Sequence, residues 1–297
     1  MECGPFETAV AGEFPSRSQW DAAAADLVAT MLARWNLTAG EPFVGGEAAC
    51  VLRVSRSDGS PAVLKIGYPH VEATWEAVGL EAAAGLAPTV YRQDAWTWSM
   101  LLEEVTPGTP MSRAELGTDD ALVQGAELLA ALHARPVPPG IPTLADAMGA
   151  YAAQARDRMP GQAAALDALG IRGLVDHAIA DLVDLAATGK ATALLHGDFN
   201  PGNLLLDGRR GWIVIDPKPM SGDPAFDLWP LVGQLGTDIG HNLAVAAGAA
   251  GVDAERAARW SLARTGINVG WYLAEGLAGQ AESEAKALRG WARLLGA

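Results

Sequence analysis

Three polar residues with well-defined spacing lie in the segment from residue 194 to residue 232. Asp198 comes first, Asn203 follows five residues later, and Asp216 lies thirteen residues after Asn203. Phosphoryl transfer needs a carboxylate that accepts a hydroxyl proton and oxygen ligands that hold Mg²⁺. Two carboxylates and one amide could meet both needs. We therefore interpret Asp198 as a candidate catalytic base, and Asn203 and Asp216 as candidate ligands of the metal ion.

Each of these residues also has a simpler interpretation. Asp198 could form a turn, Asn203 could bond to its own loop backbone, and Asp216 could be a turn residue before Pro217. None of the simpler interpretations predicts the joint spacing. We therefore prefer the chemical interpretation for all three.

The motifs around these residues resemble the catalytic core of the aminoglycoside phosphotransferases, which are relatives of the protein kinases. The motifs are His-Gly-Asp at 196–198, Ile-Asp-Pro-Lys-Pro at 215–219 and Gly-Asp-Pro-Ala-Phe-Asp-Leu at 222–228. They look most like the streptomycin and hydroxyurea phosphotransferase branch. The specific part covers about forty residues, and a weaker resemblance extends upstream to about Gly45. The resemblance implies ATP and Mg²⁺ as cofactors and a hydroxyl group on a small molecule as acceptor.

The resemblance also implies a lysine that contacts the phosphates of ATP. The run Ala-Val-Leu-Lys at 62–65 resembles the kinase strand that carries this lysine, which here is Lys65. Such a lysine needs a glutamate from the next helix. Of Glu72, Glu76 and Glu81, we expect Glu76 to fit best and Glu72 second. An exposed strand lysine and solvated glutamates are the alternatives.

Two further nucleotide contacts follow from the resemblance. The segment from Glu103 to Val105 looks like the hinge whose backbone would hydrogen-bond adenine, although it could be an ordinary strand end. A loop that covers the phosphates is expected at residues 45–49. Trp271, on a late helix, could bind a cationic sugar or be a core residue.

The hydrophobic pattern predicts the elements that must position these residues. Helices are expected at residues 19–35, 69–84, 143–157 and 162–187 and in the stretch from 242 onward. Strands are expected at 51–54, 61–66, 90–94 and 99–104, with a hairpin turn at 57–60 and a breaker cluster at 106–110. We predict an α+β, bilobal, protein-kinase-like fold. Residues 1–105 would form a small antiparallel-sheet N-lobe that binds nucleotide. Residues 106–297 would form a larger, mainly helical C-lobe with the catalytic loop, the metal site and the acceptor pocket.

Composition limits the partners. The 297 residues are 50% hydrophobic and 19% charged, which suits two buried cores. The net charge of −14 argues against nucleic acid and anionic membranes, which need basic surface. It suits a cationic small substrate, although solubility alone would also explain it. No protein partner is implied. An acidic N-terminal segment and short apolar runs lead us to expect a soluble, cytoplasmic protein.

We therefore predict an ATP- and Mg²⁺-dependent O-phosphotransferase whose acceptor is a streptomycin-like aminoglycoside, which would give antibiotic resistance. A kinase of a sugar, an amino sugar or another metabolite remains an alternative. A second alternative is a nucleotide-binding pseudokinase. The presence of all four transfer residues argues against the pseudokinase; they are Lys65, Asp198, Asn203 and Asp216.

Overall fold

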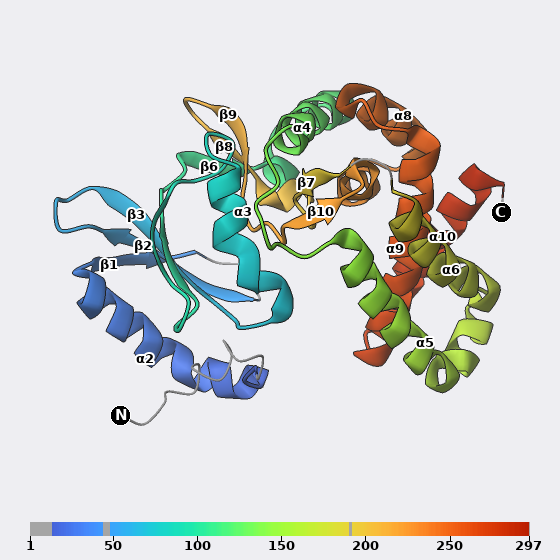
Figure 1. Cartoon of the computed structure of the whole chain (residues 1–297), viewed down its shortest axis with the longest axis horizontal. Coiled ribbons are helices and arrows are strands. Elements are labelled where there is room, and N and C mark those ends of the chain that lie inside the picture. Colours follow the sequence, from blue (N-terminus) through green and yellow to red (C-terminus); the bar gives the residue numbers. More distant parts are fainter. Residues whose placement is uncertain (1–13, 44–47, 190–191, 297) are drawn as a thin grey trace. The chain divides into compact units, whose positions relative to one another are not determined.

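The computed structural model describes residues 14–43, 48–189 and 192–296 (Figure 1). The chain forms two compact units. The first comprises Met1–Thr109 and Leu205–Lys218, and the second comprises Pro110–Leu204 and Pro219–Ala297. The segment that carries Asp216 thus returns to the unit that carries Lys65. Each unit is described by itself, and the division into functional lobes at residue 105 stays a prediction.

A five-stranded antiparallel sheet is the centre of the first unit. Its strand order is β1-β2-β3-β5-β4. The strands are β1 (Thr38–Pro42), β2 (Ala49–Ser55), β3 (Pro61–Gly67), β4 (Val90–Asp94) and β5 (Ser99–Leu102). The predicted turn at 57–60 joins β2 to β3, and Gly59 has the positive φ of 80° that a tight turn needs there.

One face of this sheet packs against α2 (Arg17–Trp35), which lies along the strands in Figure 1. Met31 of α2 is fully buried against Leu64 and Ile66 of β3 and Leu101 of β5. Successive side chains of a strand point to opposite faces. Lys65 therefore points to the face of the sheet that α2 does not cover.

The segment after β3 differs from the prediction. A single helix was expected over 69–84, but the chain forms a short 3-10 helix, η1 (Val71–Trp75), and then α3 (Glu76–Ala82). The hydrophobic pattern continues through the junction, so it does not reveal the change of helix type. Glu76 becomes the first residue of α3, where a negative charge interacts favourably with the helix dipole.

A three-stranded sheet leads to Asp216. It has the order β6-β8-β9 and consists of β6 (Pro107–Pro110), β8 (Leu204–Asp207) and β9 (Gly211–Val214). Most of its residues belong to the first unit. The main-chain N–H of Val214, at the end of β9, donates to the carbonyl oxygen of Leu86 at 2.8 Å. This bond ties the strand before Asp216 to the segment after α3.

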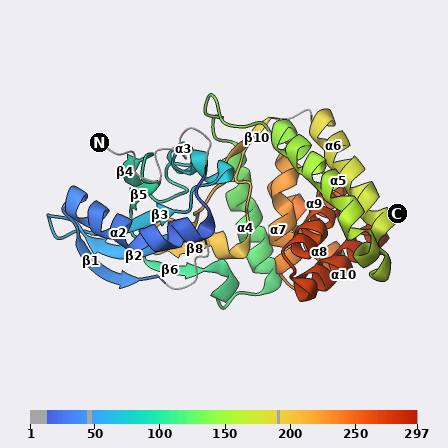
Figure 2. The same ribbon diagram turned by 90° about the horizontal axis from the view of Figure 1, so that it is seen from below.

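The second unit is mainly helical, as Figure 2 shows. Its long helices are α4 (Thr118–His133), α5 (Leu144–Ala168), α6 (Arg172–Thr188), α8 (Ile239–Ala250), α9 (Ala254–Ala274) and α10 (Ala278–Leu295). Two helices were predicted between 143 and 187 with a break at 158–161. Instead α5 continues through Pro160. Proline removes one backbone donor but does not end a helix that packs along its length, so the predicted break was wrong.

A small strand pair holds the catalytic segment inside this helical unit. β7 (Ala193–Leu195) pairs antiparallel with β10 (Met220–Gly222). All three residues of β7 are buried. Two short elements flank the pair, η3 (Pro201–Asn203) after β7 and η4 (Pro224–Asp227) before α7 (Leu228–Gln234). A short buried strand followed by a tight loop therefore carries Asp198.

The predicted fold class is confirmed. The fold is α+β, with a small antiparallel-sheet lobe and a larger helical lobe of the protein-kinase-like type. Within the described part of the chain, no helix is both long and apolar enough to cross a membrane.

Candidate active site

Lys65 lies at the centre of a buried charge cluster in the first unit. Its Nζ donates to Oε1 of Glu76 at 2.6 Å and to Oδ1 of Asp216 at 2.5 Å. The residues Lys65 and Glu76 are each only 7% exposed, whereas the side chain of Asp216 is 49% exposed. Three residues that are far apart in sequence are thus brought together. The expected partner Glu76 is the one that bonds to the lysine.

The cluster has two carboxylates for one ammonium group. Burial by itself would lower the pKa of Lys65, but attraction to Glu76 and Asp216 raises that pKa above its ordinary value. Burial raises the pKa of Glu76, and the nearby Asp216 adds to this, while Lys65 opposes it. Lys65 therefore stays charged at neutral pH. A second cation at the exposed carboxylate of Asp216 would offset the remaining negative charge.

The backbone at Asp216 is strained. Asp216 follows β9 and has a φ of 54°, a left-handed conformation that few residues other than glycine adopt. Strained residues of this kind concentrate at functional sites. Two residues later, Nζ of Lys218 lies 3.0 Å from Oε2 of Glu72. Glu72, the second candidate partner of Lys65, thus pairs with Lys218, and Glu76 is the partner of Lys65.

The candidate hinge is held by arginines that sequence reasoning missed. Glu103 follows β5, and its Oε1 accepts hydrogen bonds from Arg209 at 3.2 Å and Arg210 at 3.0 Å. Arg210 also donates to Asp207 at 2.9 Å, and this contact lowers the pKa of that carboxyl. The motif Asp-Gly-Arg-Arg-Gly at 207–211 predicts a turn, but nothing local reveals its partner a hundred residues upstream.

The hinge backbone retains a free donor. The N–H of Glu103 donates to the carbonyl oxygen of Thr89 at 2.9 Å. Among the described residues, the N–H of Val105 makes no hydrogen bond. An unpaired N–H beside a buried strand suits an adenine contact, and the role of Glu103 and Val105 stays a prediction. The expected phosphate loop at 45–49 falls largely outside the described residues, because 44–47 are not among them.

In the second unit, Asp198 lies on a loop that is braced from within. Nδ2 of Asn200 donates to Oδ1 of Asp198 at 3.1 Å, and the N–H of Asp198 donates to Nδ1 of His196 at 3.3 Å. His196 is fully buried and packs edge-on against Phe199. These contacts let the ring of His196 support the loop. The role of Asn200 was not predicted.

Asp227 anchors the start of this loop. Its carboxylate accepts the N–H groups of His196 at 2.7 Å and Gly197 at 2.9 Å, and its Oδ2 lies 3.0 Å from Nε2 of His133. Asp227 is 1% exposed. A buried carboxylate costs free energy unless several donors satisfy it. Here those donors are the backbone before Asp198 and the end of α4.

Asn203 and Asp216 each offer an oxygen atom that suits the metal ion implied by the resemblance. Nδ2 of Asn203 donates to the carbonyl oxygen of Asp198 at 2.9 Å. Among the described residues, nothing donates to the Asn203 amide oxygen, so it is available as a ligand. Asp216 presents a half-exposed carboxylate. Mg²⁺ is commonly bound by one or two protein oxygens together with substrate phosphates. No group of three or more His, Cys, Asp or Glu side chains in the described chain could hold a metal alone.

Comparison with known proteins decides the family. The family model described as "Aminoglycoside/hydroxyurea antibiotic resistance kinase" matches residues 34–276. The chain belongs to this family. The predicted resemblance and the enzyme class, a phosphotransferase with an alcohol group as acceptor, are confirmed.

Relatives of this kinase family match nearly the whole chain. A streptomycin 6-kinase of Streptomyces glaucescens is 33% identical over 303 aligned positions, which cover 96% of each chain. A hydroxyurea phosphotransferase of Kitasatospora aureofaciens is 35% identical and covers 84% of this chain and 73% of its own. Among solved structures, a choline/ethanolamine kinase family protein from Mesorhizobium loti has a TM-score of 0.64 at 21% identity, covering 93% of this chain and 97% of its own. That likeness concerns the fold alone.

Proposed function

We propose that this kinase transfers the γ-phosphoryl group of ATP to a hydroxyl group of a streptomycin-like aminoglycoside. The observation that supports this best is the buried cluster in which Lys65 pairs with both Glu76 and Asp216. A buried lysine held between two carboxylates costs free energy of folding, so its presence calls for a functional reason. Phosphoryl transfer from a nucleotide needs such a lysine, because the lysine contacts the phosphates of the donor.

The proposed roles follow from the chemistry of each residue. Asp198 accepts the proton of the acceptor hydroxyl, and Asn200 holds the carboxylate of Asp198 in place for that step. Lys65, braced by Glu76, contacts the α- and β-phosphates. Because Glu76 remains as its partner, Lys65 keeps a countercharge when Asp216 turns to a metal ion. The backbone of Glu103 and Val105 contacts adenine.

Asn203 and Asp216 would hold Mg²⁺ together with the phosphates. When bound, the ion would offset phosphate charge. The amide and the carboxylate bring only one negative charge between them. Most of the negative charge that balances Mg²⁺ would therefore come from the nucleotide phosphates. We expect metal binding to depend on ATP for this reason.

A cationic acceptor suits this chain. The net charge is −14, and acidic surfaces attract cations over distances of about a Debye length. Trp271, at the end of α9, is 54% exposed, which excludes the alternative of a core tryptophan. Its ring stacks on Tyr272 with centroids 6.4 Å apart. An exposed aromatic face beside acidic residues could bind a protonated sugar through cation–π contacts.

Hydroxyurea is the second candidate acceptor, because one relative of comparable identity is a hydroxyurea phosphotransferase. The streptomycin 6-kinase relative aligns over a larger share of both chains, which favours the aminoglycoside. A metabolite acceptor and a pseudokinase are less favoured alternatives. The use of ATP would suit a cytoplasmic location, which stays a prediction.

An acceptor panel tests the proposal. ADP release would be followed by a coupled assay with streptomycin, other aminoglycosides, hydroxyurea and plain sugars, and products would be examined by mass spectrometry. We expect streptomycin to gain one phosphoryl group, with turnover that Mg²⁺ chelation abolishes. Turnover of a plain sugar, with none on any aminoglycoside, would reject the proposed acceptor. ATP binding without transfer to any compound would favour the pseudokinase.

A further inference from the structure

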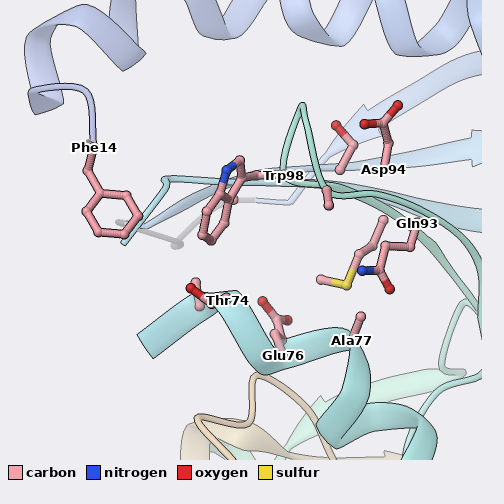
Figure 3. A pocket seen from close by; sticks show the side chains of 12 residues that line it. Phe14, Thr74, Glu76, Ala77, Gln93, Asp94 and Trp98 are labelled. Atoms are coloured by element: carbon pink, nitrogen blue, oxygen red, sulfur yellow. The ribbon is translucent and has the colours of Figure 1, made fainter. Parts of the chain in front are cut away.

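A cavity of about 210 Å³ lies between the sheet and α3 within the first unit (Figure 3). Phe14 and Trp98 form one side, Gln93 lies on the other, and Glu76 and Ala77 line it from the helix. The volume exceeds that of an apolar cavity of roughly 150 Å³ that is known to admit benzene. A single substituted ring is therefore the right size of occupant.

The walls of the cavity suit an uncharged aromatic molecule. The rings of Phe14 and Trp98 meet edge to face with centroids 6.0 Å apart, and Met100 and Ala77 add buried apolar surface. Aromatic rings favour such edge-on and offset contacts. Among the lining residues, Gln93 is exposed, and none of the described residues bonds to its side-chain amide. It can bond to one polar group on the occupant.

Both carboxylates in the wall already have partners. Asp94 is paired with Arg34 and accepts the N–H groups of Trp96 at 3.0 Å and Thr97 at 3.2 Å. Glu76 is paired with Lys65. An ionised occupant would lose its hydration and would have to compete with the partners that both carboxylates already have. The walls therefore favour a neutral ligand.

Trp98 is held in a costly conformation. Its φ is 52°, which is unusual for a bulky residue. Its indole Nε1 is buried, and none of the described residues accepts a hydrogen bond from it. A strained backbone and an unsatisfied buried donor on the same residue call for a functional explanation. A binding site for a ring-shaped ligand beside the indole would provide such an explanation.

The cavity shares residues with the charge cluster. Glu76 lines it and also bonds to Lys65, and Met100 lines it and is the direct cross-strand neighbour of Lys65. Any occupant would therefore touch the residue that braces the lysine. An occupant that packs against Glu76 would restrict its side chain to the position from which it bonds to Lys65.

We infer that this cavity is a second binding site, for a small uncharged aromatic molecule, and that its occupancy tightens nucleotide binding through Glu76. The effect on nucleotide rests on the proposed function.

Ligand-observed ¹⁹F NMR with 4-fluorophenol tests the site in the full chain. We expect saturable binding that Ala77→Leu, which fills the cavity, weakens by about tenfold. Ala82→Leu on the same helix lies outside the cavity and should leave binding unchanged. Ala73→Leu, at another lining residue, provides a second filling variant if Ala77→Leu does not fold, as judged by circular dichroism.

Calorimetric titration with Mg²⁺ and a non-hydrolysable ATP analogue tests the coupling. Saturating 4-fluorophenol should lower the Kd of the analogue by about fivefold in the wild type and not in the filled variant. Non-saturable binding, equal binding to the filled variant, or an unchanged or raised Kd would overturn the inference. If the proposed nucleotide site is wrong, the analogue binds neither with nor without the phenol, whereas binding of the phenol itself is still measured by NMR.

Discussion

At the scale of single residues, the stability of the cluster around Lys65 depends more on the lysine than on either carboxylate. Lys65 is the only cation that bonds to Glu76 among the described residues, whereas Lys65 has two carboxylates. Loss of the lysine leaves the buried carboxylate of Glu76 without its cation and removes one cation from the half-exposed carboxylate of Asp216. Loss of Glu76 leaves the lysine paired with Asp216.

We therefore expect Lys65→Ala to reduce stability by about 3–5 kcal/mol, the usual cost of an unpaired buried charge. Glu76→Gln should cost clearly less and should raise the KM for ATP with a smaller change in kcat. Urea unfolding and steady-state kinetics measure these effects. Equal destabilisation by the two substitutions would contradict the shared-lysine arrangement.

Asp198 has a narrower role. As the proposed base, it acts on the acceptor proton and does not hold nucleotide. Asp198→Asn should lower kcat by about 100-fold or more while nucleotide affinity stays the same. Asp26→Asn, on the exposed face of α2, is the matched control. A turnover within a few-fold of wild type would remove Asp198 from this role.

At the scale of elements, the loop that carries Asp198 depends on η4 and on the end of α4. Asp227 of η4 accepts two backbone N–H groups from the loop, and His133 of α4 contacts the same carboxylate. His133 therefore contacts the loop only through Asp227. We interpret it as a positioning residue.

His133→Leu should lower kcat about tenfold, because the loss of one donor to a buried carboxylate costs about 1–2 kcal/mol. The KM for ATP should stay the same, and His133→Gln, which keeps a donor, should recover part of the loss. His177→Leu, an exposed histidine of α6, is the control. A rise in the KM for ATP with unchanged kcat would argue against a role in holding the loop.

At the scale of the whole molecule, a partly buried carboxylate in the helical unit links stability to pH. Glu284 of α10 has no hydrogen-bond or ion-pair partner among the described residues, and burial raises its pKa from 4.5 to about 7. The folded state thus holds a proton that the unfolded state releases between those values. Stability should fall as pH rises from about 4.5 to 7 and stay lower above it.

Glu284→Gln removes this dependence. At pH 8 the variant should be more stable than the wild type by about 1–3 kcal/mol, and at pH 4.5 the two should be nearly equal. Urea unfolding at both pH values measures the difference. Glu282→Gln, an exposed neighbour, should show no such gain. A variant that is less stable than the wild type at pH 8 would show that Glu284 has a favourable partner.

The spacing of apolar residues along the chain predicted much of the fold, because single helices and hairpins depend on that spacing. Alternating apolar residues predicted the β2–β3 hairpin, and helical spacing predicted α2 to within two residues at its start. The errors occurred where packing overrides local preference. α5 passes through Pro160, and the helix before Glu76 changes type at Trp75. Neither feature changes the spacing of the hydrophobic residues, so the sequence pattern does not reveal it.

The amino-acid sequence by itself determined the family, the residue types of the site and the choice of Glu76 as partner, because each depends on spacing along one segment. The tertiary structure alone decided that residues 205–218 return to the first unit, where Asp216 meets Lys65. It also decided that Arg210 reaches Glu103, that His133 reaches Asp227, and that a cavity lies beside Glu76. These contacts join residues that are far apart in the chain. Their formation depends on how whole helices and strands pack, and the spacing of residues within one segment does not predict that packing.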